Sequence, residues 1–319
     1  MGGRLYRTHV LPLEESMSQY YQHSGTVPIG GAIRTTIEGI AAATFLAIIY
    51  SYAINYIPIV HANILLTLGF GAVIGVIVSY ESRSTKIRNT LIPAAIGLVC
   101  GMAGLYVAWA VDFKARSGIP GLGLFAGLDP TVLVPYIQWF YENGAWGIGK
   151  GGGVVSGIPL AIVWLAEAGV IVGLAAAIPW GAYKTNVFCE SCDKWAQSTP
   201  DVLRLTDTAT EEVLGRLRDG DFAVIHQTVR AQPGADSFLR VKLDCCDSCG
   251  ETNCLGLDQV KIQVDKDGKP SEKANTLVNR MLISQKDVES MRRLAEQPLP
   301  TAVAEASPVE SAGEAAEAT

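Results

Sequence analysis

Four long apolar segments within the first 182 residues constrain the fold of this chain more than any other feature. A transmembrane helix needs about 20 consecutive apolar residues, and helices in soluble cores are rarely as long or as uniformly apolar. The sequence therefore predicts an integral membrane protein with a four-helix transmembrane domain. The expected spans are residues 35–57, 63–80, 90–111 and 158–182.

The positions of lysine and arginine predict how these helices are oriented. The linker between the second and third spans carries Arg83, Lys86 and Arg88, whereas the connection at 58–62 carries neither residue type. Loops rich in Lys and Arg stay on the cytosolic side of a membrane. We therefore expect both termini in the cytosol, the long loop 112–157 outside, and the inner or plasma membrane as the location.

Charge separates the apolar half of the chain from a polar half. Residues 183–319 hold 16 Lys and Arg against 23 Asp and Glu, a net charge of −7, while residues 1–182 have a net charge of +1. Nucleic-acid binding needs a basic patch, which this acidic half lacks. The expected domains are a cytosolic segment 1–34, the transmembrane domain 35–182, a cytosolic domain 183–296 and a disordered acidic tail 297–319.

Pairs of glycines four residues apart occur in three of the expected spans. Small residues at this spacing let helix backbones approach closely in lipid. We favour packing within one bundle and keep a seam between copies of a homo-oligomer as the alternative. The pairs are Gly71 and Gly75, Gly97 and Gly101, and Gly169 and Gly173.

Glu167 lies well inside the fourth span. A carboxylate at that depth is costly, so it is a candidate functional residue, as a proton or cation site. A protonated carboxyl that donates a hydrogen bond to a neighbouring helix is the structural alternative. Asn55, His61 and Asp112 are expected near the outer interface, where polar groups cost little.

The outer loop contains an amphipathic, aromatic-rich segment at 130–142, which is expected to lie on the membrane surface. A glycine-rich stretch, 144–153, follows it. Gly149 and Lys150 match part of a phosphate-binding loop, but Gly151 occupies the position of the magnesium-binding Ser or Thr. We therefore interpret this stretch as a hinge before the fourth span and not as a nucleotide site.

Two C-x2-C pairs follow the last span: Cys189 with Cys192, and Cys246 with Cys249. Two such pairs can supply the four sulfur ligands of a structural zinc ion, and clustered cytosolic cysteines bind metal more often than they form disulfides. Residues 183–265 thus resemble a zinc ribbon, in which knuckles on two β-hairpins share one zinc. The 53 residues between the pairs exceed the usual spacing, which indicates an insertion.

The remaining cysteines leave alternatives open. Cys245 or Cys254 could replace Cys246 or complete the ligand shell, and Cys100 is expected to be a small buried apolar residue in the third span. A redox-active pair at Cys189 and Cys192 is a further interpretation, although no βαβ unit surrounds it.

The polar half predicts a small α+β domain. Its pattern favours helices at 210–218 and 284–295, the second opened by a capping box of Ser284 and Asp287. Four strands are expected at 222–230, 238–243, 257–264 and 276–283, with a turn at 265–268 before the last.

These features favour a non-enzymatic function. No catalytic set is evident, and His226 is expected on a strand in a structural role. The first hypothesis is a membrane protein whose zinc-stabilised cytosolic domain binds another protein. The alternatives are a transporter or channel-like protein that uses Glu167, and a membrane thiol oxidoreductase that uses Cys189 and Cys192.

Overall fold

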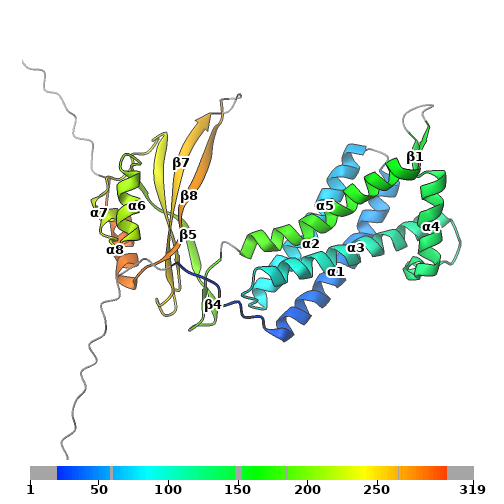
Figure 1. Cartoon of the computed structure of the whole chain (residues 1–319), viewed down its shortest axis with the longest axis horizontal. Helices are drawn as coiled ribbons and strands as arrows, with labels where there is room; N and C mark the ends of the chain where they lie inside the picture. The colour runs from blue at the N-terminus through cyan, green and yellow to red at the C-terminus, as the bar shows by residue number, and fades with distance from the viewer. Residues whose placement is uncertain are drawn as a thin grey trace, which may run out of the picture. The chain divides into compact units, whose positions relative to one another are not determined.

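The computed structural model describes residues 20–57, 60–147, 153–183, 186–264, 266 and 268–299. The chain forms two compact units, coloured along the sequence in Figure 1. The helical unit contains Tyr21–Gln197 together with Cys246–Cys249, and the sheet unit contains Ser198–Cys245 and the chain from Gly250 onward. Each unit is described by itself.

Four helices of the helical unit are long and apolar enough to cross a membrane. They confirm the four predicted spans. Six of their eight ends lie beyond the predicted ones, because hydropathy marks only the apolar part of a helix whose hydrogen bonds continue through polar flanks; α1 ends and α3 begins within one residue inside the prediction. The helices are α1 (Ile29–Tyr56), α2 (Val60–Ser84), α3 (Leu91–Ser117) and α5 (Gly157–Tyr183).

Helices α1 and α3 pack through small side chains. Ala43 and Ala47 of α1 are buried, and Gly104 of α3 approaches Ala43 closely enough that an added Cβ atom would lie 3.3 Å from it. Cys100 is fully buried, with its Sγ atom against Gly39. Cys100 is therefore the small buried residue that the sequence predicts.

Glycines of α2 and α3 bring both helices against α5. A Cβ atom on Gly71 would lie 2.6 Å from the carbonyl oxygen of Ile171, and one on Gly97 would lie 2.0 Å from that of Ala175. Gly169 and Gly173 of α5, in contrast, have no described atom within 4 Å of such a Cβ position. Two of the three glycine pairs thus pack within the bundle, and the third does not.

Short elements connect α3 to α5. Asp129 caps α4 (Pro130–Asn143) by accepting a hydrogen bond from the backbone N–H of Thr131 at 2.9 Å. Helix α4 covers the predicted amphipathic segment. A short 3-10 helix η1 (Ala126–Leu128) precedes it, and strands β1 (Trp146–Gly147) and β2 (Val154–Val155) pair after it.

The sheet unit is built on a four-stranded sheet in the order β5-β6-β7-β8, with helices on one face (Figure 1). Strands β6, β7 and β8 are antiparallel neighbours. The strands are β5 (Gln197–Leu205), β6 (Ser237–Cys245), β7 (Asn253–Val264) and β8 (Pro270–Leu282), and the helices are α6 (Thr210–Arg218), α7 (Val224–Gln227) and α8 (Gln285–Glu296).

The core of this unit lies between the sheet and the helices. Leu239, Val241 and Leu243 alternate along β6 toward that face and pack with Leu217 of α6 and Met291 of α8. The capping box of Ser284 and Asp287 forms as predicted at the start of α8.

The predicted strand at 222–230 is wrong, because α7 occupies its centre. Val224 and Ile225 are adjacent and both buried, and a strand would place them on opposite faces. The carboxylate of Asp221 accepts a hydrogen bond from the backbone N–H of Ala223 at 3.1 Å, which supports the helical turn. His226 consequently lies on a helix and not on a strand.

The sequence interpretation missed β5. This strand contains Pro200, and its first five residues are exposed, so its sequence lacks apolar alternation. Its place at the edge of the sheet tolerates both features, since an edge strand has one side without ladder hydrogen bonds.

Several predictions fall outside the described residues. They concern the cytosolic segment up to Gln19, the glycine stretch at 148–152 with Lys150, parts of the turn at 265 and 267, and the tail from residue 300.

Candidate metal centre

The first cysteine pair lies on a small hairpin that directly follows α5. Strand β3 (Phe188–Cys189) pairs antiparallel with β4 (Lys194–Trp195), and Cys192 lies in the turn between them. Asp193 adopts a positive φ of 51°, a conformation that Asp tolerates better than most residues, and this closes the turn. The hairpin thus presents both sulfurs from one short loop.

The loop between α2 and α3 holds this hairpin in place. Arg88 contacts Glu190 at 2.6 Å and lies over the ring of Phe188 at 4.6 Å. Lys86 forms an ion pair with Asp193, and the indole N–H of Trp195 donates to the backbone carbonyl of Arg83 at 2.9 Å. The basic linker that predicts topology is therefore also the support of the hairpin.

These contacts explain why the compact units divide the chain differently from the expected domains. The expected boundary lies at residues 182 and 183, whereas the helical unit continues through Gln197. The hairpin belongs with the helices because its charged and aromatic side chains contact them.

The second pair, Cys246 and Cys249, lies in the loop that joins β6 to β7. Gly250 follows with a φ of +66°, so the chain leaves the knuckle through a conformation that favours glycine. Strand β5, helices α6 and α7 and strand β6 form the insertion between the pairs. The long spacing is thus a folded insertion, as the resemblance to a zinc ribbon requires.

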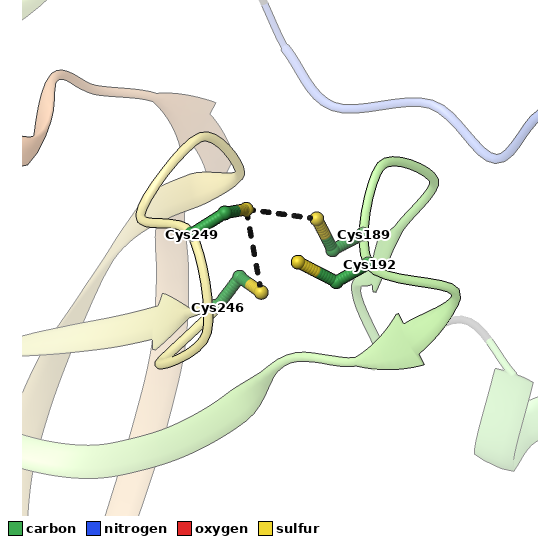
Figure 2. Close-up of side chains that lie close together, drawn as sticks. All are labelled: Cys189, Cys192, Cys246 and Cys249. Carbon is green, nitrogen blue, oxygen red and sulfur yellow. Dashed lines mark hydrogen bonds between the residues drawn. The ribbon is translucent and has the colours of Figure 1, made fainter.

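The structure brings the four sulfurs together, as Figure 2 shows. All four lie within 4.8 Å of one another; the Sγ of Cys249 is 3.5 Å from that of Cys189 and 3.7 Å from that of Cys246. A tetrahedral zinc ion with Zn–S bonds of about 2.3 Å separates its sulfurs by about 3.8 Å. The cluster therefore has the size of a four-sulfur metal site.

Neighbouring groups give the thiols different acidities. Burial raises the pKa of Cys246, but hydrogen bonds from the backbone N–H groups of Cys249 and Ser248 and from the side chains of Cys189 and Cys249 together lower the pKa to about 7. For Cys192, a hydrogen bond to Cys249 together with burial raises the pKa to about 12. Four thiolates this close repel one another, and a bound divalent cation would remove that repulsion.

The two alternate ligands lie elsewhere. Cys245 and Cys254 are buried in the sheet unit, Cys245 within its apolar core, and neither belongs to the four-sulfur group. Burial raises the pKa of Cys254 to about 12, but its position outside the four-sulfur group is what excludes it as a ligand. The geometry thus selects Cys189, Cys192, Cys246 and Cys249.

The other candidates are separate from this cluster. Glu167 faces the interior of the bundle and accepts a hydrogen bond from Tyr50 of α1. His226 pairs with the hydroxyl of Ser290 at 2.9 Å, which agrees with a structural role.

Comparison with known proteins adds no further assignment, since no family model, curated protein or solved structure matches this chain.

Proposed function

We propose that this chain is a multi-pass membrane protein that presents a zinc-stabilised module in the cytosol, and that the module binds another protein. The proposal rests on one observation: four cysteine sulfurs from two separate knuckles lie within 4.8 Å of one another. Four thiolates form the closed shell typical of structural zinc, which leaves no open position for catalysis.

Zinc is proposed in preference to a redox pair. A dithiol that forms a disulfide needs only two cysteines, such as Cys189 and Cys192, and gains nothing from a second pair. Here the second knuckle lies beside the first. The hairpin β3–β4 has only two-residue strands, and a metal held by all four sulfurs would add to the support that it receives from the α2–α3 loop.

Chemistry also suggests the kind of partner. Residues 183–319 carry a net charge of −7, which favours a partner with a basic surface. The knuckle residue Asp247 is exposed between two of the proposed ligands, so it is a suitable position for detecting contact.

Crosslinking tests the proposed partner. A photoreactive residue at position 247 of the full-length chain in cells is expected to crosslink to one main protein. The crosslink should weaken at high salt, and it should disappear when Cys246 is replaced by alanine, because the knuckle then no longer holds its shape. A crosslink that persists without zinc, or that joins only copies of this chain, would refute a zinc-dependent partner site.

Topology has a separate test. Single replacements Glu142→Cys in α4 and Lys266→Cys in the β7–β8 turn, both exposed positions, can be labelled on intact cells with an impermeant maleimide. We expect labelling of Glu142→Cys on intact cells, labelling of Lys266→Cys only after permeabilisation, and no outside labelling of the wild-type chain. The reverse pattern would place the cysteine cluster outside the cytosol and would remove the main argument for metal over disulfides.

A further inference from the structure

The helical unit contains a cavity of about 770 Å³ that the proposed function does not use. Ligand pockets for small organic molecules measure about 300–1,000 Å³. Helices α1, α2, α3 and α5 contribute to the lining, and Phe140 of α4 and Trp146 of β1 complete it at one end. The cavity thus extends from the α4 end of the bundle to Glu167.

Side-chain size explains why the helices separate here. At Ile171 and beyond, glycines of α2 and α3 contact α5 closely. On the other side of Glu167, the rings of Trp109 and Trp164 meet edge to face at 5.0 Å and stand between α3 and α5. The helices therefore pack tightly at Ile171 and beyond, whereas the rings of Trp109 and Trp164, which line the cavity, hold α3 and α5 apart toward the α4 end.

Two carboxylates face this cavity, and one of them, Asp112, has both its hydrogen-bond partners and a neutralising charge within the protein. Asp112 accepts hydrogen bonds from Asn55 at 2.8 Å, from Arg116 at 3.0 Å and from Tyr136 at 2.8 Å. Arg116 also neutralises its charge. Asp112 is therefore a structural group that joins α1, α3 and α4.

Glu167 is different. Its partner among the described residues is the hydroxyl of Tyr50, which also contacts Thr67 at 3.1 Å. No described Lys, Arg or His forms an ion pair with it. Glu167 lies 10 residues after Gly157, about 15 Å along the helix, at a depth where an uncompensated carboxylate is costly. A bound cation would supply the missing charge.

The rest of the lining indicates what kind of cation fits. Most lining side chains are apolar or aromatic, including Tyr50, Trp109, Phe140, Trp146 and Trp164. A metal ion prefers a shell of several oxygen ligands. Among the oxygens of this lining, those of Ser51 and Asp112 already form hydrogen bonds within the protein. Aromatic rings beside a carboxylate attract ammonium groups that carry apolar substituents. We propose that the cavity binds a small organic cation, with Glu167 as its counter-ion. Such binding is also the first step that the transport alternative would require.

Binding of phenyltrimethylammonium tests this site. The full-length chain in zwitterionic nanodiscs is titrated with the probe, and saturation-transfer NMR follows its methyl signal against empty nanodiscs. Glu167→Gln is expected to weaken binding by about tenfold or more, because it removes the charge and keeps the shape. The matched control Glu142→Gln makes the same chemical change on the exposed surface of α4 and should leave the affinity unchanged.

A competition experiment on the wild-type chain tests the same proposal without depending on whether a variant folds. The neutral isostere tert-butylbenzene should displace the probe only at concentrations about tenfold higher or more, since it lacks the charge. If tert-butylbenzene competes equally, or if folded Glu167→Gln binds the probe as well as wild type, the cavity recognises shape alone and the proposal fails.

Discussion

Replacing Cys246 by alanine is expected to remove bound zinc from the full-length chain, whereas the same change at Cys245 should leave the zinc in place. The sulfur of Cys246 lies in the cluster, 3.7 Å from that of Cys249. The adjacent Cys245 is part of the core of the sheet unit. Two neighbouring cysteines thus receive the same substitution with opposite expected results.

Metal analysis of protein purified without chelators measures this effect. Wild type and Cys245→Ala should carry one zinc per chain, and Cys246→Ala close to none. Loss of the metal should also speed amide hydrogen exchange in residues 187–196, because the short hairpin then keeps only its contacts with the α2–α3 loop. A ligand present at a free concentration of 100 times its Kd stabilises a fold by about 2.7 kcal/mol, and the free energy lost with the zinc should be on that scale.

The opposite pattern would change the ligand assignment. A Cys246→Ala chain with full zinc, or a Cys245→Ala chain without it, would place Cys245 in the site. A wild-type chain without zinc that also resists other divalent metals would end the metal hypothesis and return the cluster to thiol chemistry.

Hydropathy predicts the four spans well because the bilayer imposes one strong physical demand on each segment by itself. The ends of the spans are harder to predict. Arg34 and Glu38 form an ion pair at 2.9 Å within α1, one turn apart, and such polar turns continue a helix that hydropathy alone would begin later.

The ligand chemistry of the cysteine site could be predicted from the sequence, but the elements that surround the site could not. C-x2-C spacing is local, so the sequence alone identifies the knuckles. The sequence does not show that Cys246, at the end of β6, lies close to Cys189, because this depends on how the whole 53-residue insertion folds. Nor does it show that the hairpin packs on Arg83, Lys86 and Arg88, because these contacts join residues more than 100 positions apart in the sequence.

The surroundings of Glu167 in the cavity are even harder to predict from the sequence. Glu167 stands out in the sequence because a charge within an apolar helix is rare. Tyr50 and Thr67, which surround it, are ordinary residues in separate helices. Periodicity can suggest which face of a helix is buried, but it cannot pair that face with a neighbouring helix.

Gly97→Ala is expected to destabilise the helical unit, although alanine is intrinsically the better helix former by roughly 0.8–1 kcal/mol. The added Cβ atom would lie 2.0 Å from the carbonyl oxygen of Ala175, so α3 and α5 must move apart. Overpacking of this kind costs about 1–3 kcal/mol. Unfolding by SDS in mixed micelles, followed by circular dichroism, measures the change.

The control for this experiment is Gly173→Ala. No described atom lies within 4 Å of its added Cβ, so within a single chain the change should be neutral or slightly stabilising. Equal destabilisation of both variants would contradict the packing of α3 on α5. If Gly173→Ala instead dissociates an oligomer while the chain remains folded, Gly169 and Gly173 form a seam between copies. Tight packing at Gly97 and open space at Gly173 therefore separate the two interpretations of the same glycine spacing.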